Sequence, residues 1–163
     1  MSYWQTKQLS DVCLLDKKQG NYSGLPYVGL EHIESMTGRF IGDFSATDVK
    51  SSTFKFTKEH ILYGRLRPYL NKVLLPSFDA GHCSTEIMPL KVNEEIQAKY
   101  LFYWLTSSEI VDKINDTCTG ARMPRANMKE VMSFEIPLPP IPEQQRIVAI
   151  LDKAFADIEK VRA

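Results

Sequence analysis

Hydrophobic residues near the C-terminus recur at a helical period. Residues 143–163 contain no proline or glycine. A series of apolar positions alternates in steps of four and three, at Ile147, Leu151, Ala154, Ile158 and Val161. Such steps place side chains along one narrow stripe of a helix, as the a and d positions of a heptad repeat do. The pattern predicts a helix over residues 143–163 that pairs along its length with another helix.

The segment before this helix, residues 137–142, is dominated by proline, which occupies four of its six positions. Proline has no backbone N–H donor and a fixed φ angle, so it does not fit inside a helix or a central strand. We therefore expect a stiff, extended strap that connects the helix to the rest of the chain.

Residues 1–136 combine short apolar runs with turn residues, a pattern typical of strands. We expect strands in residues 26–30, 49–56, 61–75, 84–92 and 131–136. In residues 8–15 we expect either a strand or a helical turn followed by a strand. Within residues 61–75, Gly64 and Pro68 predict a bend between two strands. Ala80 and Gly81 predict a turn, and residues 31–42 are expected to form a loop.

Residues 94–116 give the strongest helical signal inside this region. Asn93 can cap the helix, the following residues supply a wide apolar face, and Ser107 and Ser108 predict a break within it. Strands together with helices predict an α+β fold. We expect a globular domain with a mixed or antiparallel sheet and helices, followed by a coiled-coil-type helix.

Composition changes this picture little. A chain of 163 residues, 44% hydrophobic and 25% charged, is typical of one globular domain. Basic and acidic residues both number 20, so the net charge neither favours nor excludes nucleic acid as a partner. No apolar run reaches the roughly 18 residues of a membrane helix, and the N-terminus lacks an apolar signal segment. We therefore expect a cytoplasmic protein.

Signals for catalysis or metal binding are weak. Cys13, Cys83 and Cys118 are far apart, so their spacing favours neither a disulfide framework nor a zinc site. Cys83 follows His82 and is a formal candidate nucleophile, although we favour a strand start here. The chain has no phosphate-binding glycine loop, no nucleophile elbow and no Asn/Asp-Pro-Pro-aromatic methyltransferase loop. We expect a non-catalytic protein that itself binds no metal or cofactor.

Two basic segments are candidates for nucleic-acid contacts. The first, around the predicted bend, contains Arg65, Arg67 and Lys72; the second, a loop without acidic residues, contains Arg122, Arg125 and Asn127. Arginine can bind guanine, and asparagine adenine, through paired hydrogen bonds, and basic side chains neutralise phosphates. The alternative is that both segments are solvated loops without a ligand.

Four stretches of the chain, in their order and spacing, resemble the specificity subunit of type I restriction–modification systems. They are residues 63–72, 83–85, 119–122 and 138–148, and the last, in which Glu143 and Gln144 open the helix, is the most specific. Trp4, Leu9 and residues 11–12 also fit, so the resemblance covers nearly the whole chain.

This resemblance implies a DNA target recognition domain in residues 1–136, a proline strap in 137–142 and the start of a spacer helix in 143–163. Subunits of this family carry two such domains, each reading one half of a bipartite DNA site, and their helices pack antiparallel. The subunit is itself non-catalytic. It recruits methyltransferase subunits, which bind S-adenosylmethionine, and restriction subunits, which use ATP. With one domain, this chain is expected to be a half-subunit or a fragment, and half-subunits can form homodimers.

The same resemblance makes both basic segments candidates for DNA contacts and adds Ser84 and Thr85, but it does not supply the base-reading residues themselves. The alternatives are a mainly structural role for residues 65–72, with Arg67 in an internal ion pair, and a turn cap for the serine and threonine. The apolar stripe from Ile147 to Val161 would pair the helices. The competing function is a protein–protein scaffold that docks a partner through its helix without reading DNA.

Overall fold

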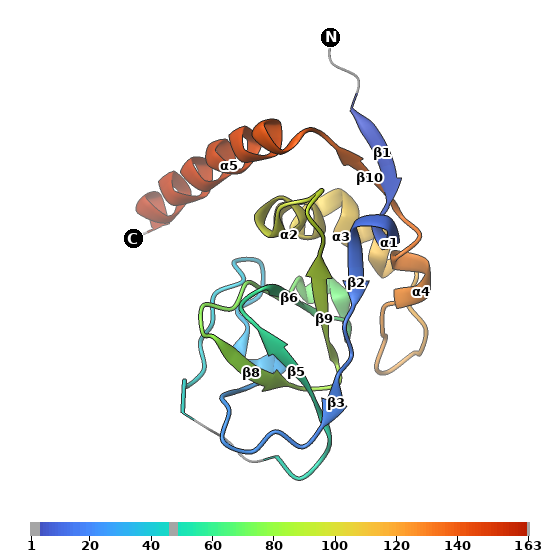
Figure 1. The fold of residues 1–163 in the computed structure, drawn as a ribbon, viewed down its shortest axis with the longest axis vertical. Coiled ribbons are helices and arrows are strands. Elements are labelled where there is room, and N and C mark those ends of the chain that lie inside the picture. Colours follow the sequence, from blue (N-terminus) through green and yellow to red (C-terminus); the bar gives the residue numbers. More distant parts are fainter. Residues whose placement is uncertain (1–3, 46–48, 163) are drawn as a thin grey trace.

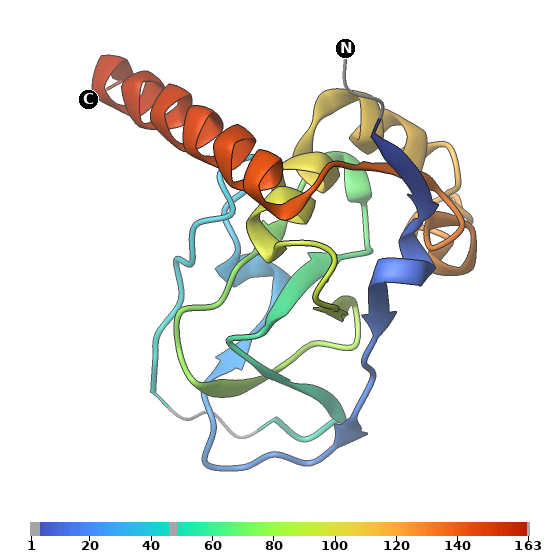
Figure 2. The ribbon, with the colours of Figure 1, turned by 45° about the horizontal axis from the view of Figure 1, so that its top comes forward.

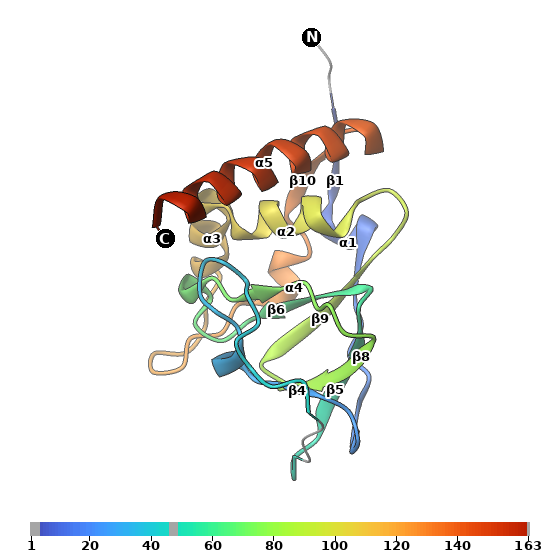
Figure 3. The ribbon, with the colours of Figure 1, turned by 90° about the vertical axis from the view of Figure 1, so that its left-hand side faces the viewer.

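The short strands of the chain assemble into three sheets (Figure 1). The computed structural model describes residues 4–45 and 49–162. Helices α2 (Ala98–Thr106) and α3 (Ser108–Asn115) lie between the two larger sheets and a long C-terminal helix, α5 (Ile141–Arg162) (Figure 3). This arrangement confirms the predicted α+β fold.

The first four-stranded sheet is entirely antiparallel. Its strand order is β2 (Cys13–Leu15), β9 (Ile87–Val92), β6 (His60–Gly64) and β7 (Val73–Leu74). Every residue of β6 is buried, because the strand is central and carries a continuous apolar run. The predicted bend is confirmed, since β6 ends at Gly64 and a short 3₁₀ helix, η2 (Pro68–Leu70), precedes β7.

The second sheet is mixed. Its order is β3 (Gln19–Gly20), β5 (Thr53–Thr57), β8 (Ala80–Cys83) and β4 (Tyr27–Val28), and β4 runs parallel to β8. The turn predicted at Ala80 and Gly81 is wrong, because both residues belong to β8. A Cβ atom on Gly81 would lie 2.5 Å from the ring of Phe56. The glycine therefore serves close packing in a strand and not a turn.

The predicted helix over residues 94–116 is confirmed in its core and in its break at Ser107. It begins later than expected, at Ala98, because the backbone of Gln97 is extended. Of the two alternatives for residues 8–15, the structure shows the helical turn followed by a strand, as α1 (Leu9–Val12) and β2. The four-residue helix α4 (Met128–Val131) and the 3₁₀ helix η1 (Leu30–His32) were not predicted individually. Helix α4 replaces the start of the strand expected in residues 131–136.

The N-terminal strand β1 (Gln5–Gln8) pairs antiparallel with β10 (Glu135–Leu138), directly before α5. Pro137 lies in this two-stranded ribbon, opposite Thr6, where an edge position tolerates proline. Helix α5 begins at Ile141, two residues before the predicted start. Pro142 fits there because the N–H groups of a helix's first turn have no intrahelical acceptor.

Buried apolar side chains from both larger sheets, α2 and α3 form one cluster that includes Phe56, Ile61, Leu90, Leu101 and Ile114. From the edge of this body α5 projects outward, and its C-terminal turns extend past the sheets (Figure 2). Among the described residues, no helix has both the length and the apolar character needed to cross a membrane.

Candidate nucleic-acid interface

Three predicted segments meet on one surface, at the side of the body that carries α4 in Figure 1. The N–H of Arg65 donates to the carbonyl of Glu86 at 2.9 Å, and the N–H of Arg67 donates to that of Pro124 at 2.7 Å. The N–H of Ala126 donates in turn to the carbonyl of Arg65 at 2.8 Å. We call residues 65–72, 84–86 and 119–127 the loop cluster.

Glu86 joins the two basic segments through its carboxylate. Its Oε1 accepts a hydrogen bond from Nη2 of Arg65 at 2.9 Å, and its Oε2 accepts one from Nε of Arg125 at 2.6 Å. The Glu86 side chain is only 18% exposed, so these ion pairs are more shielded than ordinary surface pairs. Sequence reasoning missed Glu86. Its only signal was a single acidic residue directly after Ser84 and Thr85.

Arg67 and Arg122 differ from the two arginines held by Glu86. Both are exposed, and within residues 4–45 and 49–162 neither side chain forms an ion pair. Arg67 has a φ of 51°, a left-handed conformation that is uncommon for residues other than glycine. Its backbone is held there by the bond to Pro124 and by the N–H of Leu70, which donates to its carbonyl. The alternative of an internal ion pair for Arg67 is not what the structure shows.

The remaining predicted residues make local contacts. Nζ of Lys72 donates to the carbonyl of Leu30 at 2.8 Å, which ties the cluster to η1. The Asn127 side chain caps α4 by accepting from the N–H of Glu130 at 3.2 Å.

Ser84 has the turn-capping role, because its Oγ accepts a hydrogen bond from the N–H of Glu86 at 3.1 Å. Thr85 is half-buried beside it.

The loop cluster is strongly basic although the whole chain is neutral. It contains five basic side chains and one carboxylate. Tyr69 and Met123, both about half exposed, lie in the same segments, and sequence reasoning did not single them out. Exposed basic groups beside an aromatic ring can contact phosphates and stack on bases.

The predicted pairing stripe on α5 is divided between two environments. Ile147 and Leu151 are half-buried and, with Val148, line a hollow against Tyr100 and Trp104 of α2. Ala154, Ile158 and Val161 are exposed. Only the C-terminal part of the stripe is therefore open to a partner.

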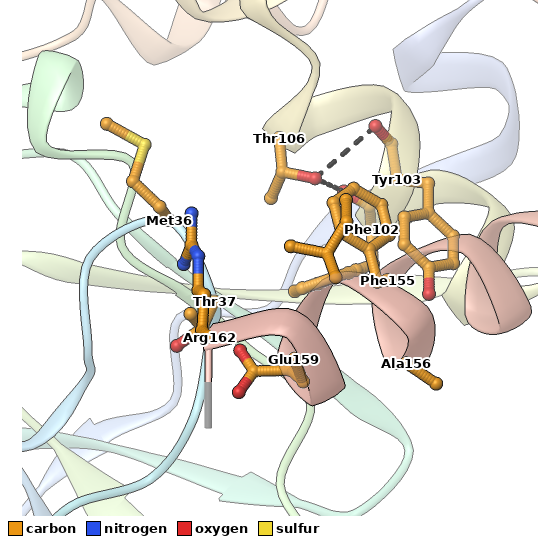
Figure 4. Close-up of a pocket in the computed structure, with 10 residues that line it drawn as sticks. Met36, Thr37, Phe102, Tyr103, Thr106, Phe155, Ala156, Glu159 and Arg162 are labelled. Carbon is orange, nitrogen blue, oxygen red and sulfur yellow. Dashed lines mark hydrogen bonds between the residues drawn. The ribbon is translucent and has the colours of Figure 1, made fainter.

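A groove of about 330 Å³ lies between the C-terminal half of α5 and the body. In Figure 4, Phe155 of α5 lies beside Phe102 and Tyr103 of α2, with Met36 on the other side of the groove. Its lining is mainly apolar and continues the exposed stripe.

Cysteine and metal chemistry find no support in the described part of the chain. Cys83 is fully buried, its Sγ contacts the carbonyl of Ile87, and burial raises the pKa of its thiol. Burial also raises the pKa of Cys13, to about 12. An activated nucleophile needs the opposite shift of its pKa. No group of three or more His, Cys, Asp or Glu side chains among these residues is arranged to hold a metal ion.

Comparison with known proteins gives consistent matches. The family described as "Type I restriction modification DNA specificity domain" matches residues 1–163. The chain is 31% identical to the type I restriction enzyme EcoDI specificity subunit of Escherichia coli over 157 residues, which cover 95% of this chain and 35% of that protein. It is 41% identical over 63 residues to the EcoR124I/EcoR124II specificity subunit of Escherichia coli, covering 37% and 15% of the two chains.

Solved structures share the fold. A chain from a structural study of complex assembly and conformational transition of the type I R-M system superposes with a TM-score of 0.81 at 24% identity, covering 99% of this chain and 44% of that one. The HsdS subunit from Thermoanaerobacter tengcongensis superposes with a TM-score of 0.77 at 24% identity, covering 98% and 44%. The chain thus spans about a third of the EcoDI relative and under half of these structures.

Proposed function

Because the chain belongs to the type I restriction–modification DNA specificity family, we propose that its body reads one half of a bipartite DNA site through the loop cluster. The observation that carries this proposal is the convergence of the three segments. They lie apart in the sequence, yet backbone hydrogen bonds join them into one basic surface on a protein whose net charge is zero. Phosphate neutralisation favours such a surface as the contact with DNA.

Within this surface the basic side chains have different roles. Arg67 and Arg122 are exposed and unpaired among the described side chains, so they can reach base edges or phosphates. Arg65 and Arg125 are held by Glu86 and present their remaining N–H groups from fixed positions. The other predicted residues, Lys72, Ser84, Thr85 and Asn127, support the surface. They contact DNA only through polar atoms that are not already used in local hydrogen bonds.

The partners follow from the family and from α5. We infer that the body recruits methyltransferase subunits, which bring S-adenosylmethionine, and restriction subunits, which bring ATP, while this chain performs no catalysis. Helix α5 is the start of the spacer. Its exposed residues Ala154, Ile158 and Val161 pair with a second recognition unit, which in a half-subunit is a second copy of this chain.

Selection from a pool of random duplex DNA tests the reading function and also supplies the target. Fluorescence anisotropy with the selected duplex, at two salt concentrations, should show weaker binding at higher salt, because phosphate contacts release counterions. Arg67→Ala and Arg122→Ala should each cost about 1–3 kcal/mol of binding free energy wherever a paired base contact is lost.

Lys160→Ala is the matched control, because this exposed cation lies on α5, away from the loop cluster. Unchanged affinity in both arginine variants would exclude this surface as the reader. The absence of any enriched sequence and of any salt dependence would favour the scaffold function instead.

A further inference from the structure

Gln144, in the first turn of α5, is a polar side chain with 0% of its surface exposed. Its Oε1 accepts a hydrogen bond from the backbone N–H of Gln97 at 2.8 Å. Its Nε2 donates to the carbonyls of Glu95 and Pro139, both at 2.9 Å. One amide therefore satisfies a donor and two acceptors, and these partners fix which end of the amide carries the oxygen.

These three partners belong to the elements that meet where α5 leaves the body. Glu95 and Gln97 lie in the segment that enters α2, and Gln97 is the residue that caps it. Pro139 lies in the proline strap. The hydroxyl of Tyr100, on α2, adds a bond to the carbonyl of Pro137 at 2.8 Å. Loss of the amide would remove the partner of three backbone groups at once, the N–H of Gln97 and the carbonyls of Glu95 and Pro139.

A second contact between α5 and α2 lies eight residues further along α5. Asp152 accepts a hydrogen bond from the hydroxyl of Tyr103 and pairs with Nζ of Lys99 at 2.9 Å. The ring of Phe155 stacks on that of Tyr103 with centroids 5.6 Å apart. Intervals of four residues separate Gln144, Val148 and Asp152, so all three lie on the face of α5 that packs on α2. Two fixed points about 12 Å apart hold a rigid helix in one direction.

We propose that Gln144 is the positioning residue that sets the direction of α5 relative to the recognition domain, and thereby the number of base pairs allowed between two half-sites. This inference rests on the proposed function, because it assumes that α5 spaces two readers on one duplex. The physical basis of the proposal is the length of α5, because a small change of angle at its base moves its far end by a large distance. The 22 residues of α5 span about 33 Å. A tilt of about ten degrees at its base would displace its far end by about 6 Å, which is nearly two base-pair steps.

A spin-label distance measurement tests the direction of α5 on the full chain. Labels on cysteines placed at Lys160, on α5, and at Lys58, in the exposed turn between β5 and β6, report their separation. Cys118, which is half-exposed, is replaced by serine, whereas Cys13 and Cys83 are buried and do not take up label. Gln144→Glu keeps the shape but turns an oxygen toward the carbonyls of Glu95 and Pro139. The distribution of distances should broaden or shift by on the order of 5 Å.

Gln145→Glu is the matched control, because its side chain is the same but exposed, and it should leave the distribution unchanged. If Gln144→Glu does not fold, Tyr103→Phe removes the hydroxyl that donates to Asp152 in the second contact and keeps the ring stack. It should shift the distribution in the same sense. A distribution identical to that of the wild type in every folded variant of Gln144 and Tyr103 would overturn the proposal.

The consequence for spacing is measured in the complex with its methyltransferase subunits. A library of DNA carries the selected half-sites separated by a graded series of spacer lengths, and methylation is scored for each length. The wild type should favour one length, and Gln144→Glu should methylate neighbouring lengths as well while the half-site bases stay the same.

Equal spacer preference in wild type and variant, or no preference in the wild type, would overturn the link between Gln144 and spacing. Failure of the wild-type body to select any half-site would instead overturn the proposed function. The distance measurement on α5 would be unaffected by that result, so the two failures are distinguishable.

Discussion

Glu86 divides the arginines of the loop cluster into two kinds. Arg65 and Arg125 lie 21 and 39 residues from it in the sequence, yet both side chains meet its carboxylate. The sequence identified all four arginines as candidates, because their type and local context are visible in one dimension. It could not tell the paired from the unpaired ones, since the pairing depends on how three loops pack together. The contacts of Glu86 are therefore a property of the tertiary structure.

Glu86→Gln tests what this carboxylate does for recognition. The amide keeps the size but carries no charge and one acceptor oxygen, so one of the two arginines loses its partner. The net charge of the surface rises by one, which strengthens general attraction to phosphates. We expect the ratio of affinities for the selected and a scrambled duplex to fall, while binding to the scrambled duplex is retained or increased. Anisotropy titrations at two salt concentrations measure both.

Glu59→Gln provides the comparison for that variant. It makes the same change of charge on a side chain that is 72% exposed and lies outside the loop cluster. Its selectivity should match that of the wild type. If the two variants lose selectivity equally, or if neither does, Glu86 has no positioning role.

The elements of the fold were predictable wherever one periodic signal dominated. The bend between β6 and β7, the break at Ser107 and the long C-terminal helix are all local properties of the chain. Strand β8 was missed because Ala80 and Gly81 mimic a turn, whereas the glycine is explained by the close approach of the Phe56 ring and the Pro26 carbonyl. The four-residue helix α4 was missed because it is too short to show a period.

Helix α5 shows the same limit in its apolar stripe. The heptad spacing correctly indicated a helix that pairs with another helix, but it could not say which helix Ile147 and Leu151 face. In the structure these residues, together with Val148, line a hollow against α2 of the same chain. A one-dimensional pattern reports that a face is apolar and does not report what covers it.

Val148→Ala measures how firmly α5 rests on the body. The Val148 side chain is 8% exposed, so its truncation removes buried apolar surface and leaves a small cavity. We expect a loss of about 1–2 kcal/mol in the free energy of unfolding, determined by urea denaturation. Ile150→Ala, on a side chain that is 54% exposed, should change this free energy by less than about 0.5 kcal/mol. Equal losses would mean that α5 does not pack on α2 in solution.

The molecule as a whole has no net charge and combines one basic surface on its body with a helix that is apolar on its open side. The family match covers residues 1–163, but the chain spans only about a third of the EcoDI subunit. Under the proposed function this chain reads one half-site, and a second recognition unit reads the other. The groove beside Phe155 and the exposed Ile158 and Val161 form the open face of α5 on which a second unit can pack.

Self-association through α5 is the property that follows from this open face. Val161 is 86% exposed and Ile158 nearly half exposed, so replacing both with aspartate removes pairing surface without disturbing the core. We expect sedimentation velocity to show a concentration-dependent dimer for the wild type and a monomer for Ile158→Asp/Val161→Asp, with an unchanged unfolding midpoint. Ile147→Asp is unsuitable here, because it would also strike the contact with α2.

Lys153→Ala, an exposed change on the same helix, should leave the dimer intact, because Lys153 is not part of the apolar stripe. A wild-type chain that stays monomeric at every concentration would show that the open face does not pair two copies. Dimers in the double aspartate variant would place the pairing surface elsewhere. The driving force for pairing is exposure: burying an apolar face that no other part of the described chain covers lowers the free energy by about 25 cal/mol per Å².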